Sequence, residues 1–431
     1  MNLKNFFNLL PTYPHYKMNV FSGTNKLQEI IGTLKCLYSS VCVKGPDIDL
    51  YHRLLREKLA THCYSFASGR MGFYSILKSM NIQPNDEIII PSFTCVVVPN
   101  AILYSGAKPV YCDISSYDFN IDINKLESLI TPRTRIIYAQ HTFGQMCNME
   151  VIGKIALKYN LIVIEDAALA LGAKFNGQWG GTIGDFGYFS TDRSKVINTG
   201  LGGIVTVNNH DYLKKFSDYY NTLPYLDEKL TRNIAKTFLL NIITLHPYFY
   251  WIGKFINAVL TKFGFMTYLL DEKFTRLESI QGYPYPAKLS NICARIGISQ
   301  FQNIEENIKH RKRIAHYYNE ILKIYPYEYI EDEKNIFLRY SFLINNREYW
   351  EERFSSKIDL SIWFKTIASG KSENFGEIGY LSGSNTVSEH VCSHIFNLPT
   401  HQQIKPEKLR NLLIELKLSG DIIERKRNTI S

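Results

Sequence analysis

Lys195 stands in the segment TDRSKVINTGLGG, residues 191–203, among small and polar residues and shortly before a glycine cluster. A lysine amine can bond covalently to an aldehyde cofactor when desolvation lowers its pKa and frees its lone pair. A lysine without such surroundings is a solvated surface charge. The chemistry open to Lys195 therefore depends on which other residues the fold brings to it.

Two other stretches hold residues that suit such a site. Asp166 follows the apolar run 161–164, and a carboxylate at the end of a buried strand either caps the next helix or pairs with a cation. Ser68–Arg70 begin a helical pattern, where backbone N–H groups form either an anion site or a simple turn. Each signal is weak alone, but their order is informative: a phosphate-type turn, a strand-end aspartate, then Ser190 five residues before Lys195.

The elements that must position these residues follow from apolar periodicity. From Asp86 to Ser190, short β-rich apolar runs alternate with segments of helical period, which predicts βαβ units and a mostly parallel sheet. Three of the predicted strands end in polar residues: Gln140-His141, Glu165-Asp166 and Ser190. Because ligands bind beyond the carboxyl ends of such strands, we expect these strand ends to converge on one site.

Helical patterns flank this region. Residues 48–60 have helical spacing, and the expected apolar stripe comprises Leu50, Leu54, Leu55 and Leu59. The pattern is helical again from Asn208 to about Leu270. One long helix is predicted from Ser290 to Leu322, ahead of a weaker α+β pattern. The expected division is an N-terminal extension (1–44), a large α/β domain (45–210), a helical insertion (211–285) and a smaller C-terminal α+β domain with its linking helix (286–431).

Composition limits the classes of function. The 431 residues suffice for two or three domains, and 45% hydrophobic with 21% charged residues is ordinary for a globular protein. The net charge of +9 is mild and comes without a run of like charges, so the sequence gives nucleic-acid binding no support and suits small anionic ligands equally well.

Eight scattered cysteines, without a CxxC pair or zinc spacing, predict free and mostly buried thiols and no metal site. The first residues, MNLKNFFNLLPTYPHYK, are too interrupted for a signal peptide. No run reaches the roughly 18 apolar residues of a spanning helix. We therefore expect a cytoplasmic protein.

Six stretches carry a family resemblance: SGRMGFYSIL, NDEIIIPSFTCVVVPNAILYSGAKPVYCDI, VIEDAALALGAKFNGQWGGTIGDFGYFS, SKVINTGLGG, NICARIGISQF and IFNLPTH. On these the chain resembles the DegT/DnrJ/EryC1/StrS family of pyridoxal-phosphate (PLP) sugar aminotransferases, from about Gly45 to Leu416. The resemblance implies the type I PLP aminotransferase fold, an α/β fold with a mostly parallel central sheet flanked by helices. The large domain would then be the PLP-binding domain.

The resemblance also implies roles for single residues. Lys195 would bond covalently to PLP and then move protons, and Asp166 would keep the ring nitrogen protonated. The hydroxyl of Ser190 and the first N–H groups of a helix would hold the phosphate, while Ala168 would lie flat under the ring. The implied cofactor-binding residues are Ser68, Gly69, Arg70, Cys95, Asp166, Ala168, Leu169, Ser190 and Lys195.

Some positions depart from the family pattern or stay open. Leu169 stands where the family has a hydrogen-bonding side chain, and Cys95 where an aromatic ring often stacks on PLP. Pro286 aligns with a family Asn that reaches the phosphate of the neighbouring subunit, and Lys288 aligns with a family Arg. Lys288 could still neutralise phosphate, but Pro286 has no donor. His141 is a candidate for the substrate side of the pocket, or equally a hydrogen-bonded strand-end histidine.

The function implied by the resemblance is amino transfer, from glutamate to a nucleotide-linked keto-sugar, for cell-surface polysaccharide such as lipopolysaccharide. The enzyme would be a homodimer with active sites at the subunit interface. Some members have histidine in place of the lysine and perform dehydration, so Lys195 favours transamination. Two alternatives stay open: a PLP-dependent sugar dehydratase, and a PLP-fold protein that has lost activity.

The helical insertion has two interpretations. Within residues 237–270, Trp251, Phe255 and Val259 lie at i, i+4 and i+8, and Lys254 interrupts the run, so it is not a spanning helix. Either the insertion packs on the dimer partner or over the active site, or its helices rest on the inner face of a membrane as a peripheral contact.

Overall fold

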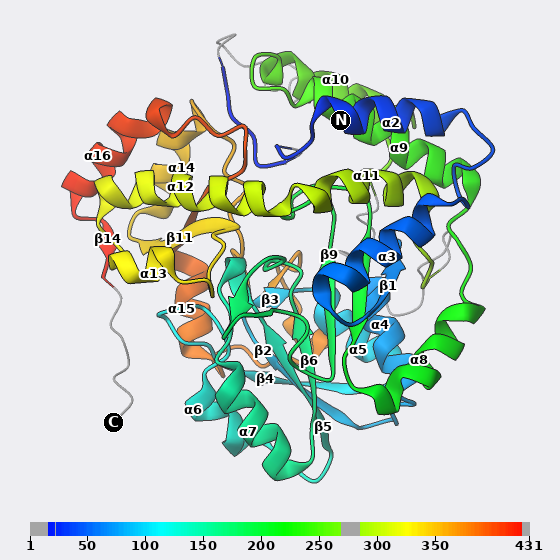
Figure 1. The fold of residues 1–431 in the computed structure, drawn as a ribbon. Coiled ribbons are helices and arrows are strands. Elements are labelled where there is room, and N and C mark those ends of the chain that lie inside the picture. The colour runs from blue at the N-terminus through cyan, green and yellow to red at the C-terminus, as the bar shows by residue number, and fades with distance from the viewer. Residues whose placement is uncertain (1–15, 22, 269–284, 425–431) are drawn as a thin grey trace.

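One large sheet forms the centre of the protein, as shown by the computed structural model of residues 16–21, 23–268 and 285–424 (Figure 1). The strand order is β1-β10-β9-β6-β5-β2-β4. The bounds are β1 (His62–Phe66), β2 (Glu87–Pro91), β4 (Lys108–Cys112), β5 (Thr134–Gln140), β6 (Ile162–Asp166), β9 (Phe186–Ser190) and β10 (Gly203–Val207). The five strands from β9 to β4 are parallel, and β10 is antiparallel to both neighbours. The mostly parallel central sheet is thus confirmed.

Both faces of the sheet are buried, because neighbouring residues along a strand enter different cores. On β5, Ile136 and Tyr138 pack in one core, and Ile137 and Ala139 pack in the other. The helices of the first core are α4 (Gly69–Ser79), α5 (Val97–Ser105) and α8 (His210–Thr222); those of the second include α3 (Asp47–Leu59), α7 (Met149–Tyr159) and α11 (Asn291–Gln302). Double burial explains why these strands are continuous apolar runs in the sequence.

The buried face of α3 is rotated from the predicted one. Leu55 and Leu59 are buried as expected, but Leu50 is 45% exposed and Tyr51 occupies the core instead. Tyr51, Leu55 and Leu59 share one helix face through i, i+4 and i+8 spacing, which Leu50 does not. The sequence analysis counted leucines and overlooked the large apolar surface of the tyrosine.

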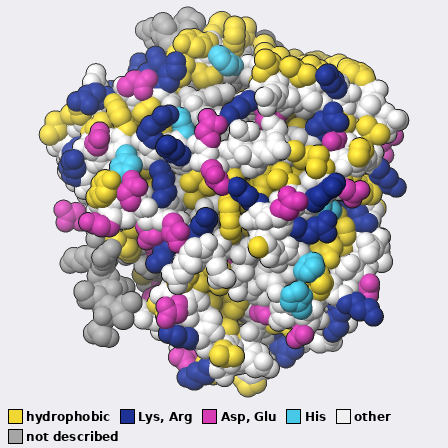
Figure 2. Space-filling model, in the orientation of Figure 1, with side chains coloured by type: hydrophobic (Ala, Val, Ile, Leu, Met, Phe, Trp, Pro, Cys, Tyr) yellow, Lys and Arg dark blue, Asp and Glu magenta, His cyan; other side chains and the backbone are white. Residues whose placement is uncertain are grey.

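The insertion is helical where the structure describes it, as predicted, with α9 (Glu228–Thr244) and α10 (Tyr250–Lys262) following α8. Helix α9 packs against α10 and against the N-terminal helix α2 (Leu27–Leu37) (Figure 1). Apolar side chains remain exposed on α2, α9, α10 and their flanking residues: Leu27, Ile31, Leu34, Tyr38, Ile243, Tyr248, Phe249, Phe263 and Phe265. Part of this surface is visible at the top of Figure 2. None of the helices in the described ranges is both long and apolar enough to cross a membrane.

The C-terminal part combines helices with a small antiparallel sheet, the predicted α+β arrangement. The sheet has the order β13-β11-β14 and consists of β11 (Arg339–Ile344), β13 (Ile395–Pro399) and β14 (Ile422–Ile423). The prediction of a single long helix is wrong. Helix α11 ends just before Asn303 and α12 (Ile304–Leu322) begins just after it, because the backbone of Asn303 leaves the helical region. The four-part division of the chain stays a prediction.

A short parallel pair joins the C-terminal part to the large domain. Strands β3 (Thr94–Cys95) and β12 (Ala368–Ser369) pair, with 3.0 Å bonds from Thr94 N to Ile367 O and from Val96 N to Ser369 O. The remaining elements are α6 (Ile123–Leu126), β7 (Lys174–Phe175), β8 (Gln178–Trp179), α13 (Tyr327–Glu331), α14 (Arg347–Ser355), α15 (Thr386–His394), α16 (Arg410–Ser419), and the 3-10 turns η1 (Glu127–Leu129), η2 (Thr142–Gly144), η4 (Phe375–Ile378) and η5 (Pro406–Leu409).

The orientation of α3 can be tested with two leucines of the same helix. Leu55→Ala should lower the free energy of unfolding by about 2–5 kcal/mol, because it leaves a cavity at a fully buried position. Leu50→Ala should lower it much less, since that side chain is largely in solvent. Urea unfolding followed by circular dichroism measures both variants, and equal losses would contradict this orientation.

Candidate active site

A cavity of about 300 Å³ opens beyond the carboxyl ends of β5, β6 and β9. Its lining includes all nine residues that the sequence analysis assigned to a cofactor: Ser68, Gly69, Arg70, Cys95, Asp166, Ala168, Leu169, Ser190 and Lys195. All three predicted strand ends also contribute as expected, through Gln140, Asp166 and Ser190. The structure thus brings these residues together, while their contacts with a cofactor stay predictions.

The first turn of α4 closes one end of the cavity. Ser68 caps the helix, and its hydroxyl accepts a hydrogen bond from Met71 N at 3.4 Å. Gly69 lies so close to the end of β9 that an added Cβ would stand 3.1 Å from both Phe189 O and Ser190 Cβ. The N–H groups of the first helical turn have no carbonyl within the helix to bind. Together with the Ser190 side chain, they form a cradle suited to an oxyanion.

Asp166 lies at the floor of the cavity and is 6% exposed. Its Oδ2 accepts a 2.6 Å hydrogen bond from the Tyr138 hydroxyl, and its Oδ1 accepts one of 2.9 Å from Ala168 N. Burial, and then the charge of Asp166, raises the pKa of Tyr138 well above its usual value, so the phenol stays a donor. Tyr138 also hydrogen bonds to the hydroxyl of Tyr188, which lines the cavity. The sequence analysis missed both tyrosines, which it treated as apolar strand residues.

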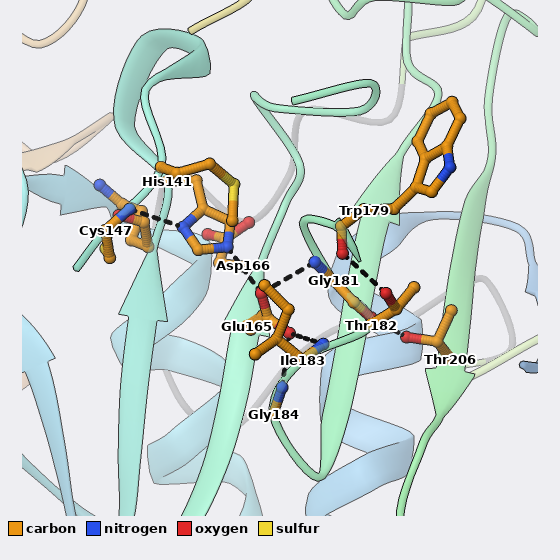
Figure 3. A network of polar contacts seen from close by, with 12 residues as sticks. His141, Cys147, Glu165, Asp166, Trp179, Gly181, Thr182, Ile183, Gly184 and Thr206 are labelled. Carbon is orange, nitrogen blue, oxygen red and sulfur yellow. Dashed lines mark hydrogen bonds and ion pairs between the residues drawn. The ribbon is translucent and has the colours of Figure 1, made fainter. Parts of the chain in front are cut away.

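Glu165 precedes Asp166 but points to the opposite side of β6, where it holds a turn (Figure 3). Its carboxylate accepts backbone hydrogen bonds from Gly181 (2.9 Å), Ile183 (2.6 Å) and Gly184 (2.7 Å). Successive side chains of a strand alternate between faces, so one acid serves the scaffold and the other faces the cavity. This network fixes the end of β6 and thereby the position of Asp166.

His141 belongs to the same buried network and does not line the cavity. Cys147 N donates to its Nδ1 at 3.2 Å, so the ring proton is on Nε2, which donates to Glu165 at 2.9 Å (Figure 3). The substrate role considered for His141 is therefore corrected: it is the hydrogen-bonded strand-end histidine. Its neighbour Gln140 lines the cavity and is held by Thr94 Oγ1 at 2.5 Å.

Lys195 faces the cavity, which leaves its side chain half-buried, while protein atoms surround its amine. Burial lowers the pKa of Lys195, and the nearby charge of Arg339 lowers it further. The groups at Cys95, Asp192 and Asp166 act in the opposite direction without cancelling the effect of burial. A lowered pKa raises the fraction of neutral amine, the form that acts as a nucleophile.

The loop that carries Lys195 is closed on itself and tied to the helices behind it. Thr191 and Thr199 join its two ends through a 2.7 Å bond between their hydroxyls and a 2.9 Å bond from Thr199 N to Thr191 O. Gly200 then turns the chain with a φ of 81°, which favours glycine. Asn307 of α12 donates to Val196 O at 2.7 Å. The amine therefore projects from a fixed backbone.

The C-terminal part of the chain supplies the facing wall, which no sequence pattern predicted. Its lining residues are Ser361, Trp363, Phe364, Ser369 and Gly370. The indole ring of Trp363 lies 4.9 Å from Lys195 Nζ and 4.0 Å from the Arg339 guanidinium. No spacing in the sequence links these residues to Lys195, because only tertiary packing brings them together.

The remaining predicted positions lie as follows. Leu169 is 5% exposed and offers the cavity only carbon atoms, and Cys95 Sγ lies 3.5 Å from Ser369 O. Lys288 does not line the cavity of its own chain; its Nζ donates to Asn221 O at 3.2 Å. Its predicted contact was with a neighbouring subunit and stays a prediction.

The residues of this cavity fit pyridoxal phosphate. Within residues 16–21, 23–268 and 285–424, no cation forms an ion pair with the buried carboxylate of Asp166, so a protonated ring nitrogen would complete its surroundings. The cradle at Ser190 and α4 suits a phosphate, and the amine of Lys195 suits an aldehyde. Among the described residues no cluster of metal-binding groups exists. The eight cysteines are free, and all but Cys95 are buried.

Comparisons with known proteins agree with this fit. The sequence model of the DegT/DnrJ/EryC1/StrS aminotransferase family matches residues 25–417. GDP-perosamine synthase of Caulobacter vibrioides is 33% identical over 262 residues, which are 61% of this chain and 57% of that protein's length. Two solved structures share the fold. Helicobacter pylori PseC, an aminotransferase involved in pseudoaminic acid biosynthesis, has a TM-score of 0.71, 20% identity, and coverage of 94% of this chain and 98% of its own. The E. coli GDP-4-keto-6-deoxy-D-mannose-3-dehydratase has a TM-score of 0.69, 19% identity, and coverage of 93% and 99%.

The buried network behind Asp166 predicts a loss of stability on removal of one charge. Glu165→Gln should lower the free energy of unfolding by about 1–3 kcal/mol. The reason is that the NH2 group of the glutamine would face backbone N–H donors that now bind a carboxylate oxygen of Glu165. Glu150→Gln, in the exposed first turn of α7, is the matched control and should have a much smaller effect. Denaturant unfolding of the two variants measures the difference; a fully stable Glu165→Gln protein would remove the scaffolding role.

The lowered pKa of Lys195 predicts a pH-dependent stability of the cofactor-free protein. Lys195→Met should stabilise the fold at neutral pH, because it removes a buried charge. Between the lowered folded-state pKa and the usual 10.5, the unfolded wild-type chain binds more protons, so wild-type stability rises with pH. The advantage of the methionine variant should therefore shrink across that window. Urea unfolding at a series of pH values tests this, and a constant difference would contradict it.

Proposed function

Since this chain belongs to the DegT/DnrJ/EryC1/StrS aminotransferase family, we propose that it transfers an amino group to a nucleotide-linked keto-sugar, with pyridoxal phosphate as cofactor and glutamate as donor. The product would serve cell-surface polysaccharide biosynthesis. The convergence of Lys195 and Asp166 on one cavity, beside an oxyanion cradle, is the observation that carries this proposal. The similarity to GDP-perosamine synthase supports it, as does the fold shared with the aminotransferase PseC.

Pyridoxal phosphate, when bound, supplies an aldehyde that can carry an amino group and a ring that can take up electrons. Asp166 would hold the proton on the ring nitrogen through its carboxylate. The donors Tyr138 and Ala168 N keep that carboxylate oriented, because each binds one of its oxygens. This arrangement needs no movement of Asp166 when the cofactor arrives.

Lys195 has two tasks in this proposal. Its neutral amine would hold the cofactor through the aldehyde group, and the same Nζ would serve as the base and acid that takes up and returns a proton during amino transfer. Burial of the amine serves both tasks because it lowers the pKa towards neutrality. Trp363 covers the amine from the C-terminal side and keeps water away from it.

Phosphate binding would rest on the Ser190 hydroxyl and the first turn of α4. The close approach of Gly69 to β9 places both on the same side of the cavity. Leu169 and Cys95 offer less to the ring than hydrogen-bonding or aromatic side chains would. Cofactor affinity should accordingly depend strongly on the phosphate cradle and on Asp166.

Two alternatives come from the same fold. A PLP-dependent dehydratase shares the architecture, as the E. coli dehydratase does, but the retained amine of Lys195 favours amino transfer. A PLP-fold protein without activity draws support from Leu169, Cys95 and Pro286 alone. Mass spectrometry of the sugar product separates gain of an amine from loss of water.

We also propose a cytoplasmic homodimer with its active sites at the subunit interface. The exposed apolar side chains of α2, α9 and α10 offer a surface for a subunit or, through residues 237–270, for peripheral contact with the inner face of a membrane. Phe249, Phe263 and Phe265 beside Lys262 would suit an anionic lipid surface. The four-part division of the chain into 1–44, 45–210, 211–285 and 286–431 belongs to the same proposal.

Lys195→Ala should abolish amino transfer. Loss of proton transfer by this residue would by itself lower the rate by about 10²–10⁴-fold. The assay incubates protein, PLP and glutamate with a panel of nucleotide keto-sugars and measures 2-oxoglutarate. Lys154→Ala, at the surface of α7, is the control and should retain full activity. Full activity in Lys195→Ala would refute the catalytic assignment, and a wild-type chain that takes up no PLP would refute the proposed function.

Membrane contact predicts binding to vesicles that depends on the exposed rings. In liposome flotation, the wild-type protein should float with vesicles containing anionic lipid, and Phe263→Ser with Phe265→Ser should reduce this several-fold. Light scattering on the same variants reports the oligomeric state. If the wild-type protein does not float with vesicles, with or without anionic lipid, the membrane interpretation is refuted and contact with a second subunit is the remaining interpretation of this surface.

A further inference from the structure

The side chain of Arg193 lies where three cavities meet, close to the amine of Lys195. It lies two residues before Lys195 and lines three adjoining cavities. One is the cofactor cavity, one is a narrow space behind Lys195 that reaches Arg339, and one extends towards α9 and Tyr268. Asp192 and Leu201 line both the first and the third of these spaces, which are therefore neighbours.

Two aromatic rings hold the guanidinium of Arg193. The ring of Phe21 lies 4.9 Å away and the ring of Tyr268 lies 4.4 Å away. A guanidinium packed on aromatic rings is attracted by their π electrons and keeps its N–H groups for acceptors in its own plane. These two rings come from segments far apart in sequence, so the position of Arg193 is set by the tertiary fold.

The insertion contributes directly to this position. The Tyr268 hydroxyl donates to Asn241 Oδ1 of α9 at 2.8 Å. The preceding residue, Thr267, donates its N–H to Thr237 Oγ1 of the same helix at 2.9 Å. Helix α9 thus fixes the ring that packs on Arg193.

The surroundings of Arg193 favour an anion. In the described ranges Arg193 takes part in no ion pair, and the carboxylate of Asp192 accepts its backbone N–H at 2.7 Å. The buried Arg339 has an Nη2 without a hydrogen-bond partner among the described residues. Four basic side chains, at 193, 195, 311 and 339, therefore line the narrow cavity. The third cavity adds the polar side chains of Asn198, Thr237 and Asn241.

We propose that Arg193 binds an oxyanion of the substrate, a carboxylate or a phosphate, and that the α9 insertion completes this subsite by holding Tyr268. The proposal rests on the proposed function and adds a recognition residue to it. A planar guanidinium can donate two parallel hydrogen bonds to either oxyanion. The two sources of such a group are the carboxylate of the amino donor and the diphosphate of a nucleotide-linked sugar.

The test compares equilibrium binding of three probes to the full chain loaded with PLP: glutarate, UDP and GDP. Arg193→Gln should raise the dissociation constant of at least one probe about tenfold or more, equivalent to about 1.4 kcal/mol. Arg193→Lys keeps the charge but not the planar fork, so it should recover only part of that loss. Tyr268→Leu should give a smaller loss of the same probe. Arg313→Gln, an exposed arginine of α12, is the matched control and should bind every probe as the wild type does.

Each outcome is decisive. A loss for glutarate alone assigns Arg193 to the donor carboxylate, and a loss for UDP or GDP alone assigns it to the nucleotide phosphates; both results support the proposal. Unchanged binding of all probes by Arg193→Gln, or a wild-type chain that binds none, overturns it. Cofactor uptake and melting temperature are recorded for every variant. If the wild type takes up no PLP, the proposed function fails, and calorimetry of the same probes on the cofactor-free chain still decides the role of Arg193.

Discussion

The burial of two opposite charges around one cavity, the Asp166 carboxylate and the Lys195 amine, is the constraint on which the rest of the structure depends. A carboxylate removed from water needs donors, and an amine removed from water loses affinity for its proton. Tyr138 and Ala168 N meet the first need, and a loop fixed by Thr191 holds the amine in place. The scaffold therefore has its reactive groups in position before a ligand arrives.

The end of β6 shows how one short segment serves both scaffold and chemistry. Glu165 and Asp166 are adjacent acids, yet the pleat of the strand directs them to opposite faces. Glu165 gathers three backbone amides and His141, whereas Asp166 keeps one side open to the cavity (Figure 3). The two acids are chemically alike, so their different roles come from the alternation of the strand and from nothing in the side chains themselves.

The sequence could predict the parallel sheet from local periodicity, and the meeting of Gln140, Asp166 and Ser190 from the rule that strand ends converge. The place of Lys195 at the same cavity was implied by the family resemblance. The sequence could not predict that Trp363 lies beside the amine or that Tyr268 packs on Arg193, since only packing between distant segments creates those contacts. His141 illustrates the opposite error. A polar residue at a strand end can face either the cavity or the buried side of the sheet. For His141 the side is set by its hydrogen-bond partners Cys147 and Glu165, which lie on other segments.

The parallel pair of β3 and β12 has a mechanical consequence. Backbone hydrogen bonds from Thr94 and Val96 attach the C-terminal domain to the wall that carries Cys95. Any hinge motion that separated the two domains along this wall would have to break those bonds. The seam is thus a fixed edge of the cavity, and a large ligand must reach the amine from a side that this seam does not close.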